Sequence, residues 1–340
     1  MFSKLLLDAG KFRLLLASMV VVVHTIGSPF GGAAVYLFFI LSGYWIAHMW
    51  ERQYASARQP HLTFAISRCW RIFPLYWLCY ALMLGVCQVT NRHDPLTWAH
   101  VLSPEWLARM AVLVGSAGQE RILRPAWSLD YEMQFYLVAP WVVMALRGTA
   151  AQRAGWIGCV VLAGWFATGQ GPLPQTVIHY CAFFLAGVLC RQGGWRPTPR
   201  LAQASAVVFL CTLLGLAGWH VGHRLGKLPV GLHETPWLNT LVVLAGFPLA
   251  VNSCHQTGDR FDRHLGNLAF PLYLSHDLVD VVFEQGLMGK GLAFKAAMLP
   301  VEWLLMAALA GAIYLWVDCP LEKLRQGFVA RRRALVVPAV

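Results

Sequence analysis

Arg13 and His24 stand at the two ends of the apolar run RLLLASMVVVVH. If this run is a helix, the two side chains lie on nearly the same face, separated by a rise of about 16 Å. A neutral imidazole is a suitable general base, and a guanidinium binds anions. The pair therefore predicts a site that holds a negative group and moves a proton. A structural alternative stays open, in which Arg13 anchors the segment and His24 packs against a neighbouring helix.

Arg68 and Arg71 follow in the segment FAISRCWRIFPLYW, three residues apart and so on one face of a helix. Two planar guanidinium groups on one face suit a ligand that carries phosphate. The alternative is that both arginines only orient the segment, with their stems along apolar surface and their charges toward water.

Two acidic residues, Asp130 and Glu132, enter a third apolar segment, RPAWSLDYEMQFYLVAPW. A carboxylate this far inside an apolar run is expected to face the interior of a helix bundle and to be paired. Glu132 is therefore a candidate site residue. The alternative is that it is only the structural partner of an arginine.

A polar stripe is formed by His276, Asp280 and Glu284, which recur at four-residue intervals in LGNLAFPLYLSHDLVDVVFEQG. The stripe predicts contact with a polar substrate. Two alternatives stay open: the stripe solvates an outer vestibule, or its carboxylates pair with Arg121 and Arg124.

The elements that carry these residues must be membrane helices. Of the 340 residues, 58% are hydrophobic and 13% are charged, against about 25% charged residues in an ordinary soluble domain. The net charge of +11 comes from short basic clusters between long apolar runs, which excludes nucleic acid as a partner and predicts orientation in a bilayer instead. The nine cysteines lack the spacing of a metal site, so we expect no metal.

We predict an all-α fold, a polytopic transmembrane helical bundle of about ten helices in a single domain over residues 1–340. The predicted spans are 12–26, 32–50, 70–90, 127–146, 155–170, 176–191, 203–221, 237–252, 267–286 and 297–317. A further short surface helix is predicted around residues 104–114. Most of the 27 lysines and arginines lie in the segments on the side of the N-terminus, so both termini are predicted to be cytoplasmic. The N-terminal segment lacks a small-residue cleavage site, so the first span is expected to remain.

Ser42 and Gly43, in the run FFILSGYWI, are small residues inside a predicted span. No GxSxG elbow surrounds the serine, so it is not expected to be a nucleophile. Small residues let two membrane helices approach closely. We therefore expect this pair to mark a helix contact.

Taken together, these segments resemble the acyltransferase-3 family of bacterial membrane O-acyltransferases. The resemblance begins with the arginine and histidine of the first span. It continues in order along the chain with YLFFILSGYWI at 36–46, SRCWRIFPLYW at 67–77, PAWSLDYEMQFY at 125–136, LGNLAFPLYLSH at 265–276 and VDCPLEKL at 317–324. Two departures stand out, since the family has a DGLR-type lead where this chain reads DAGKFR, and glutamate where this chain has Asp318.

The resemblance implies transfer of an acyl group from cytoplasmic acyl-CoA, with acetyl-CoA as the expected donor, to a hydroxyl of a cell-surface glycan or a lipid-linked sugar. It implies His24 as the central catalytic residue, Glu132 as a polar site residue, and Arg13, Arg68 and Arg71 as contacts to CoA. Long members append an SGNH hydrolase-like domain, which is not expected here.

Aromatic faces and carboxylates bind sugars, so an acceptor site is expected from Trp127 and Tyr131 beside Glu132, together with His276 and Asp280. The expected partners are thus acyl-CoA, the acceptor glycan and the lipid bilayer, in the bacterial inner membrane. Two rival functions stay open: a multi-helix transporter of a polar solute, since ionisable residues inside the membrane also line permeation paths, and a catalytically silent partner in a glycan-export complex.

Overall fold

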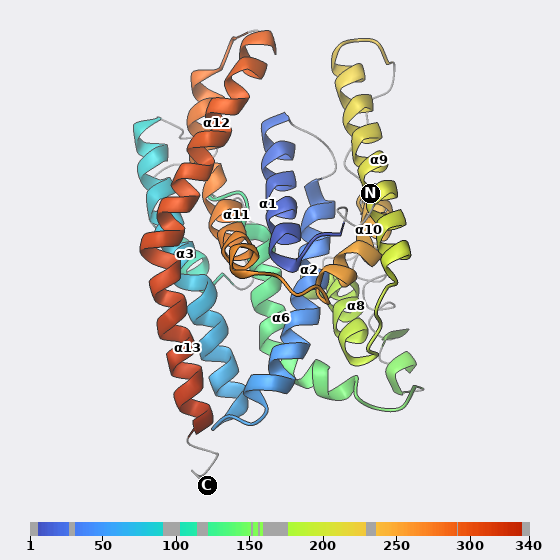
Figure 1. Ribbon diagram of the computed structural model, residues 1–340. Helices are drawn as coiled ribbons and strands as arrows, with labels where there is room; N and C mark the ends of the chain where they lie inside the picture. The colour runs from blue at the N-terminus through green and yellow to red at the C-terminus, as the bar shows by residue number, and fades with distance from the viewer. Residues whose placement is uncertain are drawn as a thin grey trace. The chain divides into compact units, whose positions relative to one another are not determined.

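The computed structural model is built from helices (Figure 1). It describes residues 6–26, 31–90, 103–113, 122–150, 152–155, 157–158, 176–228, 236–290 and 292–334. These residues form 11 α-helices and no strand, which confirms the predicted all-α fold.

The chain divides into two compact units. The first unit comprises Met1–Trp45 and Phe183–Tyr273, and the second comprises Ile46–Ala182 and Leu274–Val340. Because two compact units can belong to one domain or to two, the single domain over residues 1–340 stays a prediction.

Three helices, α2, α8 and α11, continue from one unit into the other. In chain order the helices are α1 (Ala9–Ile26), α2 (Gly31–Met49), α3 (Pro60–Val89), α5 (Pro104–Val112), α6 (Ala126–Ala145), α8 (Cys181–Gln192), α9 (Pro199–Arg224), α10 (Pro236–Ser253), α11 (Arg260–Gly286), α12 (Leu292–Ile313) and α13 (Cys319–Ala334). Short turns of other helix types cover Trp50–Tyr54, Val177–His179 and Tyr314–Asp318.

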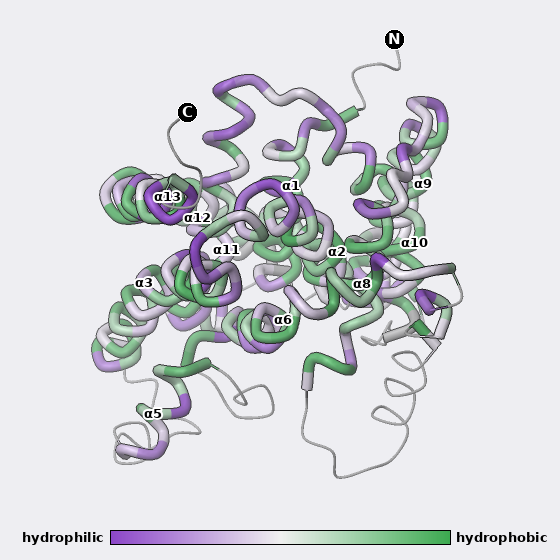
Figure 2. The backbone as a smooth tube through the Cα atoms, turned by 90° about the horizontal axis from the view of Figure 1, so that it is seen from below, coloured by the Kyte–Doolittle hydropathy of each residue, from purple (hydrophilic) through white to green (hydrophobic). Residues whose placement is uncertain are grey.

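Four helical stretches among the described residues are long and apolar enough to cross a membrane: Gly31–Tyr54, Pro60–Val89, Pro199–Arg224 and Ala297–Ala334. Figure 2 colours α2 and α10 largely as hydrophobic. Large apolar side chains such as Trp316, 79% exposed, lie on the outside of these helices, as expected where they face lipid rather than water. The multi-pass architecture that the composition predicted is confirmed.

Most predicted helices agree with the structure to within a few residues, and the short helix predicted around 104–114 is confirmed as α5. The predicted starts of the third helix at residue 70 and of the ninth at residue 267 are wrong. Helix α3 begins at Pro60 and α11 at Arg260, and each includes a polar first part that a hydropathy criterion omits. The helix predicted at 155–170 lies largely outside the described residues. The charged helix α13 was not predicted at all; its last turn, with three arginines, is hydrophilic in Figure 2.

In the first unit, the start of α1 is fixed by an acidic residue from α11. The carboxylate of Asp262 accepts hydrogen bonds from the backbone N–H groups of Gly10 at 3.0 Å and Lys11 at 2.8 Å. These N–H groups have no partner within their own helix, so Asp262 caps α1 from outside. A Cβ atom at Gly10 would lie 1.8 Å from the carbonyl oxygen of Asp262, so only glycine permits this approach.

Helices α2 and α8 cross at two glycines in the first unit. A Cβ atom at Gly43 would lie 2.0 Å from the carbonyl oxygen of Phe184, and one at Gly187 would lie 2.0 Å from that of Ile40. The rings of Phe39 and Phe184 stack beside this crossing, with centroids 4.5 Å apart. The prediction that Ser42 and Gly43 mark a close helix contact is confirmed for Gly43.

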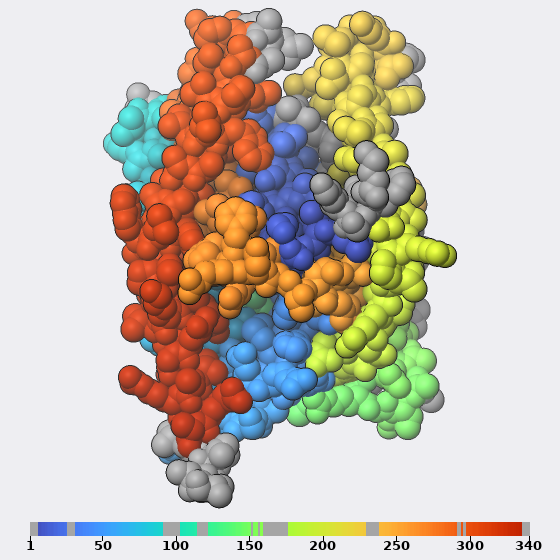
Figure 3. Space-filling model, in the orientation of Figure 1, coloured from blue at the N-terminus to red at the C-terminus, as the bar shows by residue number. Residues whose placement is uncertain are grey.

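In the second unit, α13 runs beside α3 (Figure 1). Figure 3 shows α12 and α13 as one continuous column of the surface, joined by the turn Tyr314–Asp318. This turn and Trp50–Tyr54 are π-helical, a wider coil that is rare and frequent at functional sites. Each ends on a buried polar residue, Tyr54 or Asp318.

Candidate functional site

Arg13 and His24 lie on one uninterrupted helix, α1, as the sequence predicted. Both side chains are partly exposed. The guanidinium carbon of Arg13 lies 6.0 Å from the centroid of the Trp45 ring, close enough for a cation–π contact within the first unit. With the cap at Gly10 fixing the start of the helix, Arg13 has a defined position three residues later.

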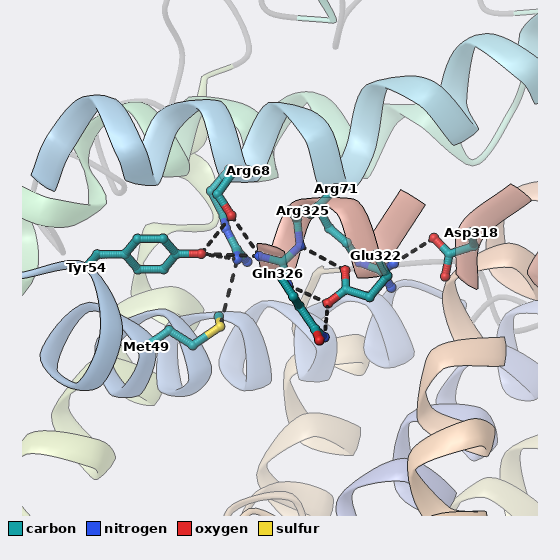
Figure 4. A network of polar contacts seen from close by, with 9 residues as sticks. Met49, Tyr54, Arg68, Arg71, Asp318, Glu322, Arg325 and Gln326 are labelled. Carbon is teal, nitrogen blue, oxygen red and sulfur yellow. Dashed lines mark hydrogen bonds and ion pairs between the residues drawn. The ribbon is translucent and has the colours of Figure 1, made fainter. Parts of the chain in front are cut away.

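Arg68 lies on α3 in the second unit and is only 5% exposed. Its guanidinium carbon lies 5.7 Å from the ring centroids of Tyr54 and Phe64 and 5.8 Å from that of Tyr136. Its Nη2 donates to the hydroxyl of Tyr54 at 2.9 Å and to the sulfur of Met49 at 3.8 Å (Figure 4). Aromatic faces attract a cation but do not neutralise it.

No carboxylate among the described residues pairs with Arg68, and its buried Nε has no hydrogen-bond partner there. A buried charge is costly unless it is paired. The arrangement thus leaves a cation whose charge and N–H donors suit an anionic ligand.

Around Tyr54, a network of polar contacts reaches from α3 to α13 (Figure 4). The hydroxyls of Tyr54 and Ser67 are 2.7 Å apart, and Nη1 of Arg325 donates to Ser67 at 2.7 Å and to Tyr54 at 3.3 Å. Arg325 also forms an ion pair with Glu322 through two of its nitrogens. Its Nε donates to Oε2 at 2.8 Å, and its Nη2 donates to Oε1. Two guanidinium groups therefore share one phenol oxygen.

Arg71, one turn after Arg68, is placed differently. Its Nη1 donates to Oδ1 of Asp318 at 2.7 Å, and the Asp318 side chain is 6% exposed. The other carboxylate oxygen of Asp318 is buried with no hydrogen-bond partner among the described residues. The charge of Arg71 is thus balanced by a carboxylate, whereas that of Arg68 is not.

Glu132 on α6 accepts a hydrogen bond from the hydroxyl of Tyr136, one turn further along the same helix. The ring of Tyr136 is the one that also covers Arg68. The predicted site residue Glu132 and the predicted anion-binding Arg68 are therefore joined through one tyrosine. Nearby, Asp130 is fully buried and accepts from Gln134 at 2.7 Å.

Trp127 and Tyr131 form an aromatic cluster with Tyr180. The Tyr131 and Tyr180 ring centroids are 4.7 Å apart, and that of Trp127 lies 5.8 Å from Tyr180. Trp127 is partly exposed, whereas Tyr131 is buried. Of the two, Trp127 offers the more accessible face.

The carboxylates of α11 surround the guanidinium group of Arg124. Nε of Arg124 donates to Asp277 at 2.6 Å, its Nη2 contacts Asp280, and its Nη1 lies 3.7 Å from Glu284. Burial alone would lower the pKa of Arg124, but Asp277 and Asp280 together raise it. Pairing with Arg124, one of the alternatives for this stripe, is thus present for Asp280 and Glu284.

Sequence reasoning missed several residues of these clusters. Asp277 was overlooked because it departs from the four-residue spacing, although positions 277, 280 and 284 also share a helix face. Glu302, which is buried on α12 close to Asp280, is the one carboxyl group in an apolar helical segment, and this feature alone makes it a candidate site residue. Tyr54 and Arg325 gave no comparable indication.

His276 is also buried, 1% exposed. Arg121 lies outside the described residues. Among the described residues, no group of three or more histidine, cysteine or acidic side chains could hold a metal ion.

These features define a multi-pass membrane protein with ionisable groups buried among its helices. A family model for an acyltransferase domain, Acyl_transf_3, matches residues 12–317 and so runs across both units. The chain therefore belongs to the acyltransferase-3 family and is a membrane acyltransferase. No curated protein and no solved structure matched the chain.

Proposed function

We propose that this membrane acyltransferase moves an acyl group, acetyl in the first instance, from cytoplasmic acyl-CoA to a hydroxyl of a cell-surface glycan or a lipid-linked sugar. The observation that carries the proposal is Arg68, a buried guanidinium without a carboxylate partner among the described residues. CoA is rich in phosphate, and a guanidinium matches phosphate geometry. Arg13 adds a second donor contact at the start of α1.

Arg68 carries the main donor contact in this proposal. Arg71 keeps its ion pair with Asp318, and in this proposal its remaining N–H groups make a lesser contact to the phosphates. The charged end of CoA then remains near cations while its flexible arm carries the thioester toward His24.

His24 acts as the general base. It accepts the proton of the acceptor hydroxyl while the hydroxyl oxygen attacks the thioester carbonyl carbon, and the carbon–sulfur bond then breaks and the thiolate takes up a proton. An acyl-histidine route remains the alternative, in which the imidazole attacks the thioester first and the acceptor then attacks the acylated ring.

The acceptor site is proposed around Glu132, with Trp127 and Tyr131 supplying aromatic faces and His276 and Asp280 supplying polar contacts. The protein would lie in the bacterial inner membrane with both termini cytoplasmic. In this arrangement acyl groups cross the bilayer through the protein, from a donor site on the inner side to an acceptor on the outer side.

The proposal is tested by labelling membrane glycans with isotopically labelled acetyl-CoA. Wild type should transfer label and His24→Ala should not, whereas His220→Ala, an imidazole lost from another apolar helix, should transfer normally. Both variants must insert at wild-type levels. Absence of labelling by wild type with every acyl-CoA tried would favour the transporter or the silent partner.

Sidedness needs a second experiment, in sealed vesicles of known orientation. Labelled acyl-CoA is supplied only on the cytoplasmic side and a membrane-impermeant acceptor only on the other. Labelled acceptor supports transfer across the bilayer. Acylation that occurs only when both substrates share the cytoplasmic side would overturn it.

A further inference from the structure

The charged helix α13 contacts Tyr54 and Ser67 next to Arg68, although it lies beyond residues 12–317, the range that the family model matches. Its Arg325 is largely buried, with a side chain 12% exposed. The contacts of Arg325 with Tyr54 and Ser67 tie α13 to the π turn and to α3 at the position next to Arg68 (Figure 4).

The hydrogen bonds of this network have only one consistent direction. The phenol oxygen of Tyr54 has two lone pairs, and both are used by the guanidinium groups of Arg68 and Arg325, so its own hydrogen must go to Ser67. Arg325 cannot accept a hydrogen bond, and its Nε and Nη2 are held by Glu322. Glu322, Arg325 and Tyr54 therefore form a chain that fixes one edge of Arg68.

Arg325 itself is a poor contact for a ligand. Its charge is balanced by Glu322 and most of its N–H groups already have partners. Arg68 differs, because among the described residues only its Nη2 has hydrogen-bond partners. The two arginines therefore differ in role. Arg325 is held in place by its partners, whereas Arg68 has N–H groups available to donate to a ligand.

We propose that Arg325, clamped by Glu322, is a positioning residue of the donor site, which acts through Tyr54 to orient Arg68 toward a phosphate group of the acyl donor. The inference rests on the proposed function, since it assumes that the donor carries phosphate. It makes α13 part of the binding site and assigns no direct ligand contact to Arg325.

The test is a binding titration of coenzyme A to the purified full-length protein in lipid nanodiscs. Arg68→Gln should weaken binding most, and Arg325→Gln should weaken it about tenfold, the loss expected when one charged hydrogen bond no longer holds its partner. The matched control is Arg332→Gln, which removes the same charge from the same helix at a residue whose side chain contacts Gln59 and Phe328, away from Arg68. Its affinity should stay at the wild-type value.

Action through Tyr54 is tested by a double-mutant cycle. If Arg325 works through the phenol oxygen, Tyr54→Phe and Arg325→Gln weaken binding by similar factors, and the double variant is no weaker than either. Arg325→Lys should rescue little, because an ammonium cannot hold Glu322, Ser67 and Tyr54 at once. If Arg325→Gln does not fold, Glu322→Gln releases the clamp while keeping the arginine and should weaken binding in the same direction.

The outcomes separate this inference from the proposed function. If wild type binds coenzyme A and Arg68→Gln weakens binding, but Arg325→Gln and Glu322→Gln bind as wild type, the positioning role is refuted and the donor site stands. Fully additive effects of Tyr54→Phe and Arg325→Gln would also refute it. If wild type does not bind coenzyme A, the proposed function itself fails.

Discussion

The ion pair between Arg71 and Asp318 allows a direct test of how much stability is lost when a buried charge loses its partner. Replacing Arg71 by Gln leaves the Asp318 carboxylate buried, with one oxygen newly without its donor and the other already lacking a partner among the described residues. We expect Arg71→Gln to destabilise the protein strongly. Asp318→Asn should cost less, because an amide is cheaper to bury than a carboxylate.

The size of the effect follows from the exposure of the pair. Breaking a fully buried ion pair costs about 3–5 kcal/mol, and the Arg71 side chain is 22% exposed, so the lower end applies. With an unfolding entropy of roughly 2 cal/mol/K per residue over this chain, a loss of about 3 kcal/mol lowers the midpoint of thermal unfolding by about 4 °C.

The assay is thermal unfolding of the purified variants in one detergent at one heating rate. The double variant Arg71→Gln with Asp318→Asn should recover most of the lost midpoint, because no charge is then left without a partner. An unchanged midpoint for Arg71→Gln would refute the reasoning. So would a double variant that is less stable than the sum of the two single changes predicts.

Three further predictions concern stability. Gly43→Ala should sharply reduce folded yield, because its Cβ would meet the backbone of α8, whereas Gly85→Ala, at a glycine with open space around it, should be tolerated; equal yields would contradict the close crossing. Asp262→Ala should lower the free energy of unfolding by about 1–2 kcal/mol through loss of the cap on α1, and a neutral result in chemical denaturation would contradict the cap. Arg124→Gln should cost about 3 kcal/mol or more, since it leaves buried carboxylates uncompensated; a midpoint within error of wild type would show that they find other partners.

The positions of the membrane helices could be predicted from the sequence because lipid imposes a strong rule. A run of apolar residues near the thickness of the bilayer must be helical, since no water is present to satisfy its backbone. The rule says nothing of where a helix continues outside the lipid. For this reason the polar start of α3 and the whole of α13 were missed, although α13 is rich in good helix formers.

The individual residues of the candidate site could be predicted from the sequence, but the partners with which they interact could not. Arg68 and Arg71 look equivalent in the sequence, because both carry a guanidinium on the same helix face. Their partners come from segments about 250 positions away or from a π turn, and those determine that one charge is balanced and the other is not. No local pattern could separate them.

The central claim is that His24 carries out acyl transfer from a CoA thioester. It is tested most directly by the turnover of His24→Ala at saturating acetyl-CoA, measured as release of free CoA thiol by membranes that contain the acceptor. We predict that turnover is lost while the affinity for coenzyme A stays at the wild-type value, because Arg68 and its network are intact. Near-normal turnover of His24→Ala would contradict the claim and would move the catalytic role elsewhere, with His276 as the next candidate.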